Sequence, residues 1–372
     1  MRTRIIQVDA EMPDIEQLKA VAKMLDEGAL VAFPTETVYG IGCRAESSSL
    51  ARLDEAKQRP IEKYYTLHIG QKKVVEEYVP RLSARGRKLV EKAWPGPLTI
   101  VFELAEQEME RQRARLSEQV FSCLYRDNSI GIRCPDAKIV SILLENANWP
   151  IVAPSANVTG QKPATDGQEV LGQLEGRIDL LLDGGRCKYG ESSTVVKVSG
   201  KKVQVLREGV VSGGDIRAMS QVNILFVCTG NSCRSPMAEG FCRKYLAEKV
   251  GCGVDQLEEN GYKVGSAGVM AIEGMPASSE SIAFCATKGV DISGHRSDPL
   301  SAELLSESDY VFVMSRAHCE RIADLCPGEV AKCRLLVENE EISDPIGRGE
   351  SIYYRCGSQI EEAVKRRVDE LI

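Results

Sequence analysis

Strand-like and helix-like segments alternate through residues 222–372, and this alternation limits the fold of the chain more than any other feature of the sequence. The apolar run VNILFVC precedes the amphipathic stretch SPMAEGFCRKYLAEKV, which has Pro236 in its first turn, where helices favour proline. More such segments follow: SSESIAFCATKG, YVFVMS, AHCERIADLC and SIYYRCGSQIEEAVKRRVDELI. Strands that alternate with helices predict a doubly wound parallel sheet with helices on both faces.

The preceding part of the chain also mixes helices and strands. EQLKAVAKMLDEG has apolar residues at helical spacing and stops at Gly28. SLARLDEAKQRP is a second helix-like stretch, and Pro60 ends it. The charged, helix-prone residues 103–128 are interpreted as a surface insertion without a chemical role.

A Ser-Gly-Gly run divides the chain into two segments that each look complete. Serine and glycine give a chain the flexibility that is typical of linkers. We therefore predict two α/β domains over residues 1–210 and 222–372, joined by a linker over residues 211–221.

Composition excludes several classes of function. A net charge of −7, from 47 basic and 54 acidic residues, argues against tight, non-specific binding of nucleic acid. No apolar run approaches the roughly 20 residues of a membrane helix, and the start of the chain has no apolar signal segment. The 13 cysteines are odd in number and include no CxxC pair, and there are only three histidines. We therefore expect a cytoplasmic protein with reduced thiols, no membrane partner and no metal site.

The most specific motif is the loop CTGNSCRS after the first of these strands. It lies between a strand and a helix, where open α/β sheets bind their ligands. Gly230 allows the tight turn that aims successive backbone N–H groups inward, with a helix N-terminus behind them. This field favours the thiolate of Cys228, the guanidinium of Arg234 matches two phosphoryl oxygens, and Ser235 can donate a hydrogen bond to the thiolate. The loop therefore predicts an anion site with a cysteine nucleophile.

A thiolate that displaces a phosphoryl group needs an acid that protonates the leaving group. Asp344 is the candidate, because it lies in the stretch ISDPIG, which predicts an exposed loop. An Asp-Pro pair alone indicates only a turn. Asp344 becomes a candidate acid because the same chain also contains the cysteine loop.

Residues 222–372 resemble the low-molecular-weight protein tyrosine phosphatase family. The matching motifs are VCTGNSCRSPMAE, SAGV at 266–269, HRSDPL at 295–300 and SDP at 343–345. The resemblance implies a phosphoprotein substrate, a phosphocysteine on Cys228 and no metal. It implies that Arg234 binds the phosphate and that Asp344 acts as acid and then as base. It also implies that Asn231 shapes a phosphate-binding loop whose other members are Thr229, Gly230, Ser232 and Cys233.

The residue at position 232 bears on substrate choice in this family. Tyrosine-specific members usually carry a bulky aliphatic residue there, whereas Ser232 resembles the arginine-phosphatase branch, in which the extra room admits a planar guanidinium. We therefore expect a preference for phosphoarginine over phosphotyrosine.

An arsenate reductase that couples to thioredoxin is the alternative, because that class shares the loop motif. Its chemistry needs two further cysteines that relay a disulfide. Cys319 and Cys326 have a suggestive spacing, but they fall on a probable helix and a turn, and Met314 stands where the first relay thiol is expected.

Residues 15–210 also contain several short polar motifs. They are PTETVYGIG, KQRP, TLHIG, WPGPLTI, GIRCP, APSAN and SSTVV, in that order. Each has an ordinary structural explanation when taken singly, such as cations at a helix end or a turn. Together, several cations and hydroxyls without a Walker motif suit a site for a polyphosphate and a small polar molecule.

These motifs resemble the YrdC/TsaC family of threonylcarbamoyl-AMP synthases. The resemblance implies a twisted open α/β sheet and a reaction of L-threonine, bicarbonate and ATP, the last with magnesium. The product would feed the machinery that makes threonylcarbamoyladenosine in tRNA. The residues implied for ATP are Lys57, Arg59, Lys63, Ser155, Asn157, Ser193 and Arg207. The residues implied for threonine are Thr35, His68 and Arg133.

Departures from the family pattern concern the ligand contacts. Ala137 replaces the histidine that often follows the arginine of the GIR motif, and Tyr64 and Tyr65 follow Lys63 where small residues or proline are usual. Another class of function also stays open. The first domain could be a non-catalytic tRNA-binding module, or one domain could be a regulatory scaffold that binds its ligand without turnover.

Overall fold

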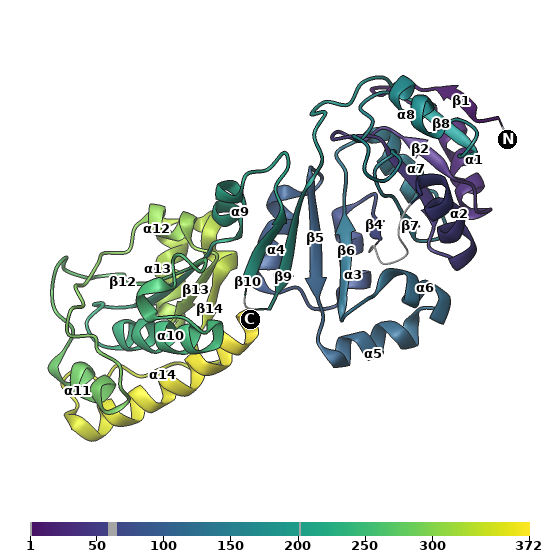
Figure 1. Cartoon of the computed structure of the whole chain (residues 1–372). Coiled ribbons are helices and arrows are strands. Elements are labelled where there is room, and N and C mark those ends of the chain that lie inside the picture. Colours follow the sequence, from purple (N-terminus) through teal and green to yellow (C-terminus); the bar gives the residue numbers. More distant parts are fainter. Residues whose placement is uncertain (1, 59–64, 201) are drawn as a thin grey trace. The chain divides into compact units, whose positions relative to one another are not determined.

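The computed structural model describes residues 2–58, 65–200 and 202–372. They form two compact units, Met1–Ser220 and Gln221–Ile372. Figure 1 shows that each unit has its own sheet and its own helices.

The segment 211–221, expected to be a flexible linker, is mostly helical. Helix α9 spans Gly213–Ser220 and packs on the first unit, where Ile216 is buried. The Oγ of Ser212 accepts the N–H of Asp215 at 3.1 Å, as a helix N-cap does. The Ser-Gly-Gly run is therefore the start of a helix, and the first unit extends beyond residue 210 because that helix buries an apolar side chain in its core.

The described residues of unit 1 form a ten-stranded mixed sheet with the order β1-β8-β2-β3-β7-β4-β6-β5-β9-β10. The strands are β1 (Arg4–Gln7), β2 (Val31–Phe33), β3 (Gly40–Arg44), β4 (Thr66–His68), β5 (Leu98–Glu103), β6 (Ser129–Arg133), β7 (Ile151–Val152), β8 (Leu180–Asp183), β9 (Thr194–Ser199) and β10 (Lys202–Arg207). Strands β4 and β6 are parallel, β6 and β5 are antiparallel, and β5 and β9 are parallel. The predicted open α/β sheet is confirmed.

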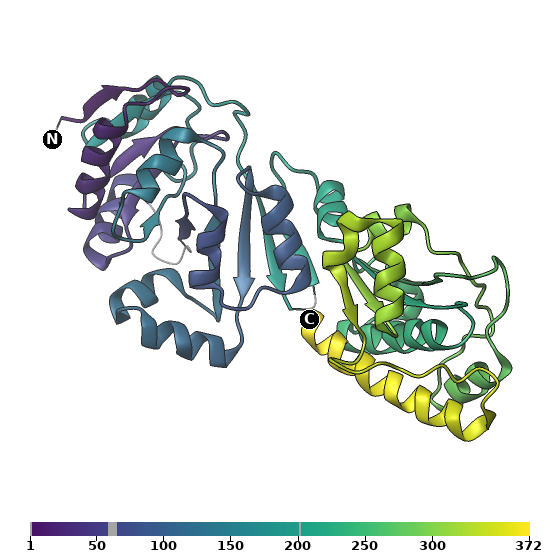
Figure 2. The same ribbon diagram turned by 180° about the vertical axis from the view of Figure 1, so that it is seen from behind.

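Helices flank this sheet (Figures 1 and 2). They are α1 (Ile15–Asp26), α2 (Ser47–Lys57), α3 (Val75–Tyr78), α4 (Ala84–Ala93), α5 (Glu106–Arg115), α6 (Glu118–Leu124), α7 (Lys138–Glu145) and α8 (Gly167–Leu174), with a 3-10 turn at Lys72–Val74. Asp14 caps α1 by accepting the N–H groups of Glu16 and Gln17. The helix ends just before Gly28, whose φ of +94° suits glycine, so the predicted stop is confirmed.

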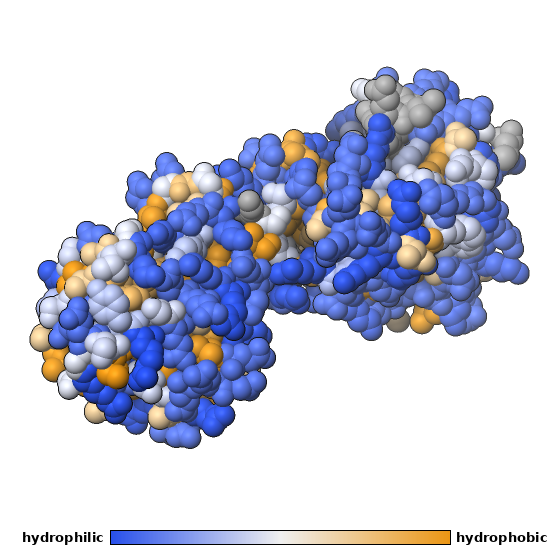
Figure 3. Space-filling model, turned by 90° about the horizontal axis from the view of Figure 1, so that it is seen from below, coloured by the Kyte–Doolittle hydropathy of each residue, from blue (hydrophilic) through white to orange (hydrophobic). Residues whose placement is uncertain are grey.

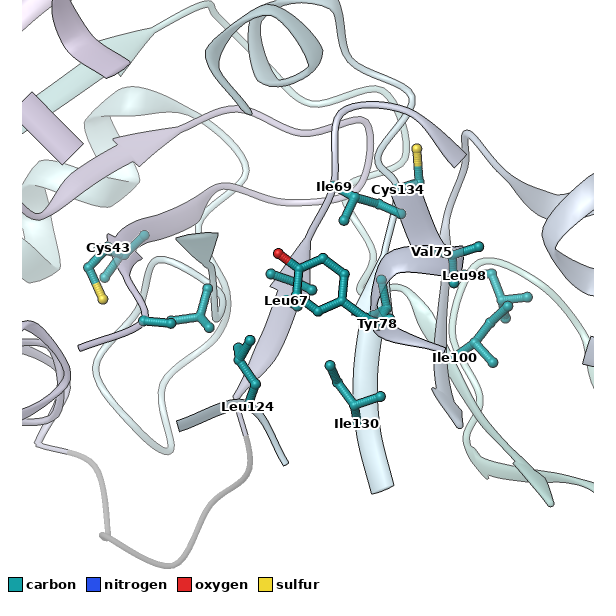
Figure 4. Packing of buried hydrophobic residues seen from close by; sticks show 14 of the residues in the cluster. Cys43, Leu67, Ile69, Val75, Tyr78, Leu98, Ile100, Leu124, Ile130 and Cys134 are labelled. Carbon is teal, nitrogen blue, oxygen red and sulfur yellow. The ribbon is translucent and has the colours of Figure 1, made fainter. Parts of the chain in front are cut away.

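The main core of unit 1 packs the helices against one face of the strands. Figure 4 shows Tyr78 among Leu67, Val75 and Ile130. The residues 103–128, predicted as a surface insertion, contribute to this core through Phe121. The hydrophobic face of α6 is therefore buried, whereas most charged residues of the segment are exposed.

Unit 2 is a four-stranded parallel sheet with the order β12-β11-β13-β14, as the alternation of segments predicted. Its strands are β11 (Val222–Cys228), β12 (Tyr262–Gly268), β13 (Tyr310–Val313) and β14 (Cys333–Leu335). Its helices are α10 (Arg234–Val250), α11 (Ser279–Thr287), α12 (Ala302–Glu307), α13 (Arg316–Leu325) and α14 (Gly349–Leu371), with 3-10 turns at Val254–Gln256 and Pro327–Lys332. Helices α10 and α14 cover one face, and α12 and α13 cover the other (Figures 1 and 2).

None of the helices in the described ranges is both long and apolar enough to cross a membrane. In the view of Figure 3, hydrophobic residues form small, scattered patches on a mainly hydrophilic surface.

Candidate active sites

Cys228 is the last residue of β11, the strand at which the order of strands in the parallel sheet of unit 2 reverses. The chain crosses from β11 to β12 on one side and later to β13 on the other, so the carboxyl end of β11 opens into the crevice between two crossovers. The loop from Cys228 leads directly into α10, which begins at Arg234. The predicted strand–loop–helix arrangement is confirmed, and it points the helix N-terminus at the cysteine loop.

Asn231 organises the loop. Its φ of +53° lies in the left-handed region, which asparagine tolerates, and reverses the chain between Gly230 and Ser232. Its side-chain N–H groups reach Ser235 Oγ at 2.9 Å and Ser266 Oγ at 2.8 Å, and its Oδ1 accepts the N–H of Asp298 at 2.8 Å. Three separate segments therefore hold the loop in shape through one buried amide.

Ser235 lies next to the sulfur, with its Oγ 3.0 Å from Cys228 Sγ. The amide of Asn231 donates to this same hydroxyl, so the serine proton is free to donate, and the sulfur at 3.0 Å and the carbonyl of Ala267 at 3.5 Å are both within its reach. Both side chains are buried, at 2% exposure for Cys228 and 0% for Ser235. The arrangement is able to stabilise a thiolate with a directed hydrogen bond.

Gly268 of the SAGV motif allows β12 to approach this loop. A Cβ at this position would lie 2.7 Å from the carbonyl oxygen of Thr229 and 2.8 Å from the nitrogen of Asn231, which are backbone atoms that cannot move aside. The following residue, Val269, donates its N–H to the carbonyl of Cys228 at 3.0 Å. The motif is therefore structural support for the loop.

Arg234 and Asp344 meet at the mouth of the loop. The guanidinium of Arg234 donates to the carbonyl of Ile342 at 3.0 Å and to Thr229 Oγ1 at 3.2 Å, and it forms an ion pair with Asp344. Its Nε is buried and has no partner among the described residues, so an oxyanion would satisfy it. Arg234 is the first residue of α10 and Asp344 lies in the loop before α14, so the fold brings together two residues that are 110 positions apart in sequence.

Cys233 points away from the loop into the helical layer. Its Sγ lies 3.4 Å from Tyr353 Oη on α14, 3.4 Å from Ser278 Oγ and 3.7 Å from Ser232 Oγ. The side chain is 4% exposed. The predicted loop residues Thr229, Gly230 and Ser232 are only partly buried.

A cavity of about 680 Å³ lies on the sheet of unit 1. Alternation along the strands produces it: Ile130 and Ile132 of β6 enter the core, whereas Ser129, Gly131 and Arg133 line the cavity. The neighbouring strands add residues to the same face, since His68 of β4 and Thr99 of β5 lie opposite Arg133 in the strand register.

The described residues predicted for ATP and threonine all line this one cavity. They are Thr35, Lys57, His68, Arg133, Ser155, Asn157, Ser193 and Arg207. Arg59 and Lys63, also predicted for ATP, lie outside the described residues. The side chains come from strands β4, β6 and β10, from the end of α2 and from three loops, so the fold gathers motifs that are far apart in sequence. Cations outnumber carboxylates in the described lining, which contains Lys57, Arg133, Lys197 and Arg207 but only one carboxylate, Asp127.

Arg133 forms a buried ion pair with Glu36, at 2.9 Å between Nη2 and Oε1. The same Nη2 donates to Thr37 Oγ1 at 2.7 Å and lies 3.5 Å from Thr35 Oγ1. Arg133 Nε and Glu36 Oε2 are buried and have no hydrogen-bond partner among the described residues. A ligand that carries both a carboxylate and an amine could satisfy the two groups.

His68 is neutral in this site. Burial, and then the positive charge of Arg133, lower the pKa of His68 to about 3. Its Nδ1 lies 3.1 Å from the carbonyl of Thr66, which can only accept, so Nδ1 carries the proton. Nε2 is then an acceptor, suited to an ammonium or a hydroxyl.

We expect the free energy of unfolding of unit 1 to fall between pH 7 and pH 5. An exposed histidine has a pKa of 6.5, so below that value the unfolded chain binds a proton that the neutral, folded His68 does not. The stability that depends on this group is complete above about pH 6.5 and is lost toward pH 3, with a loss of about 2 kcal/mol at pH 5. His68→Asn keeps a donor for the carbonyl of Thr66 and does not titrate. Thermal unfolding curves with the same pH dependence for variant and parent would contradict this assignment.

Lys57 holds the shape of the APSAN loop, residues 153–157, through hydrogen bonds. Its ammonium donates to the carbonyl of Ser155 and, at 2.7 Å, to the carbonyl of Asn157. Ser155 Oγ donates to Asn157 Oδ1 at 2.5 Å, and the Asn157 amide donates to the carbonyl of Gln161 at 2.9 Å. The lysine therefore shapes the loop and also places a positive charge in the cavity wall.

On the opposite wall, Arg207 donates to the carbonyl of Ser193 at 2.7 Å. Ser193 Oγ lies 3.0 Å from Thr99 Oγ1. Burial and the charge of Arg133 lower the pKa of Arg207, so the two guanidinium groups lie close enough to repel each other. An anion between them would relieve this repulsion.

Several residues at the two sites were not singled out in the sequence analysis. Glu36 and Thr99 were inside recognised motifs, and strand alternation places Thr99 on the same face as Arg133. Asp127 lies near the end of the segment interpreted as a surface insertion, yet it lines the cavity, so that interpretation was wrong for this end of the segment.

His318 and Tyr353 lie on helices, and no spacing in the sequence signals their contact with the cysteine loop.

Family models match both units. Residues 23–209 match the Sua5–YciO–YrdC model, described as telomere recombination. Residues 223–371 match the model of low molecular weight phosphotyrosine protein phosphatase.

Curated relatives match mainly the first unit. A threonylcarbamoyl-AMP synthase from Pyrococcus abyssi is 29% identical over 270 residues, which cover 68% of this chain and 76% of that protein. A threonylcarbamoyl-AMP synthase from Bacillus subtilis is 32% identical over 204 residues, which cover 55% of this chain and 56% of that protein. The chain thus spans little more than half the length of the Bacillus relative.

Two solved structures are similar as well. A variant of Sua5 from Pyrococcus abyssi has a TM-score of 0.50 at 20% identity, with 91% of this chain and all of that chain covered, which shows a shared fold. The low molecular weight protein tyrosine phosphatase from T. tengcongensis has a TM-score of 0.37 at 31% identity, with 41% of this chain and all of that chain covered. Since the first family model covers half of the sequence and the second covers most of the remainder, the chain belongs to the Sua5–YciO–YrdC family and carries a low-molecular-weight phosphatase domain behind it.

Proposed function

We propose that the chain is a bifunctional enzyme whose first unit forms threonylcarbamoyl-AMP from L-threonine, bicarbonate and ATP. The convergence of the predicted ATP and threonine residues on one cavity supports this proposal most strongly. The named activity of the relatives from Pyrococcus and Bacillus agrees with it.

In this reaction the protein positions reactants and neutralises charge. The carboxylate of threonine would bind Arg133 through its unpartnered Nε, and the neutral Nε2 of His68 would accept from the threonine amine or hydroxyl. Lys57 and Arg207 would balance the charge that develops on the departing pyrophosphate. Asp127 is the only carboxylate among the described lining residues, so we propose that magnesium arrives bound to the ATP oxygens.

We propose that the second unit hydrolyses a phosphoprotein through a phosphocysteine. The Cys228 thiolate attacks phosphorus, the bond from phosphorus to the leaving group breaks, and Asp344 gives its proton to that group. Water then breaks the bond between sulfur and phosphorus while Asp344 takes up a proton. A phosphoryl dianion would compete with Asp344 for the guanidinium of Arg234 and so free the carboxyl group for the leaving group.

Ser232 is expected to set the substrate preference toward phosphoarginine. Its side chain is small and partly buried, and a branched side chain would occupy more of the volume beside the loop. Ser232→Ile should lower the ratio of kcat/KM for phosphoarginine over phosphotyrosine peptides by roughly ten- to a hundredfold, the range of a steric effect of 1–3 kcal/mol. Ser232→Thr is the matched control. A parent enzyme that already hydrolyses phosphotyrosine peptides far faster would make the proposal wrong.

A side-by-side assay of the full chain tests both activities. One sample receives threonine, bicarbonate and ATP, and pyrophosphate release that depends on threonine supports the synthase. A second sample receives phosphoarginine and phosphotyrosine peptides, and a third receives arsenate with a thioredoxin system. Turnover of arsenate alone would identify a reductase, and binding of tRNA without pyrophosphate release would identify a binding module.

A further inference from the structure

His318 connects the cysteine loop to α13, although no motif of the sequence includes it. It lies in the first turn of the helix and is 4% exposed. Its Nε2 lies 3.0 Å from Thr229 Oγ1, and its Nδ1 lies 3.1 Å from the backbone nitrogen of Ser315. One buried imidazole therefore contacts both the helix start and the loop.

The contact with Ser315 determines which nitrogen carries the proton. A backbone N–H can only donate, so Nδ1 of His318 accepts, and the hydrogen of the neutral ring lies on Nε2. Burial, and then the charge of Arg234, lower the pKa of His318 to about 4, which keeps the ring neutral near pH 7. Nε2–H consequently donates to Thr229 Oγ1.

Thr229 Oγ1 receives a second hydrogen bond from Arg234 Nη2 at 3.2 Å. A hydroxyl has two lone pairs and one proton, so the histidine and the arginine together occupy its acceptor capacity. Only the hydroxyl proton of Thr229 remains to donate. It lies one residue from Cys228, beside the guanidinium that would hold the phosphoryl group.

We propose that His318 is a positioning residue that turns the hydroxyl proton of Thr229 toward a phosphoryl oxygen held by Arg234. Thr229 then donates to the charge that grows on this oxygen in the transition state. The inference rests on the proposed phosphatase function and adds to it a side-chain donor and the group that orients the donor.

The test uses the full chain and para-nitrophenyl phosphate as the probe. His318→Asn places an amide oxygen where Nδ1 accepts from Ser315, and it removes the donor to Thr229. Thr229→Val removes the hydroxyl, and Thr229→Ser keeps it. We expect His318→Asn and Thr229→Val each to lower kcat by about tenfold, the effect of one hydrogen bond. The double variant should be no slower than Thr229→Val, and Thr229→Ser, which keeps the hydroxyl, should lose less kcat than Thr229→Val.

Two results would overturn the inference. If the effects of His318→Asn and Thr229→Val multiply in the double variant, the histidine does not act through Thr229. If His318→Asn lowers Tm but leaves kcat and KM unchanged, its role is only to cap the helix. Nitrogen chemical shifts of the three histidines give a further check, since a proton on Nδ1 of His318 would contradict the assigned hydrogen bond.

Inorganic phosphate separates this inference from the proposed function. Phosphate should protect Cys228 from alkylation by iodoacetamide. His318→Asn should raise, by several-fold, the phosphate concentration that gives half of the full protection. If the parent hydrolyses no phosphate ester but this difference persists, the proposed function fails and the role of His318 stands. If parent and variant are protected equally, the inference fails whether or not the enzyme turns over.

Discussion

Replacing Cys228 with serine is expected to lower the hydrolysis of phosphate esters by at least about a thousandfold. A serine hydroxyl is not ionised near neutral pH, and the side chain within hydrogen-bond distance of position 228 is the hydroxyl of Ser235, which is too weak a base to remove its proton. The measurement is release of phosphate from the peptides that the parent hydrolyses.

Two controls accompany this substitution. Cys252→Ser alters a half-buried cysteine outside the loop and should leave phosphatase turnover unchanged. Threonine-dependent pyrophosphate release should be the same in Cys228→Ser as in the parent, since its residues lie in the other unit. Loss of both activities in Cys228→Ser would show that the units depend on each other.

Arg133→Gln is expected to abolish the synthase activity and to destabilise unit 1 as well. The arginine is the buried partner of Glu36, and its removal leaves an uncompensated carboxylate, at a cost of about 3–5 kcal/mol. It also removes the cation to which we assign the carboxylate of threonine, so any remaining activity should need far more threonine. Unfolding curves and pyrophosphate release measure the two effects separately.

The double variant Glu36→Gln with Arg133→Gln separates folding from binding. Two neutral amides of similar size carry no unpaired charge, so most of the lost stability should return. Pyrophosphate release should not return, because no cation faces the carboxylate of threonine. A stable double variant with the activity of the parent would contradict the assignment of Arg133.

Much of the fold could be predicted because it follows from local pattern. The apolar run that ends at Cys228, the helix that begins at Arg234 and the stop at Gly28 each depend on neighbours in sequence. Residues 211–221 show where such reasoning fails. Their serine and glycines fit both a linker and a helix start, and only the burial of Ile216 against the rest of unit 1 selects the helix.

By itself, the sequence determined the two families, the order of the units and most of the chemical groups at each site, because these are carried by short motifs of fixed spacing. Only the tertiary structure decided which partners those groups have. Glu36 beside Arg133 and His318 beside Thr229 are pairs separated by 97 and 89 positions. Their contacts depend on strand order and helix packing, which place distant segments side by side in ways that no local spacing encodes.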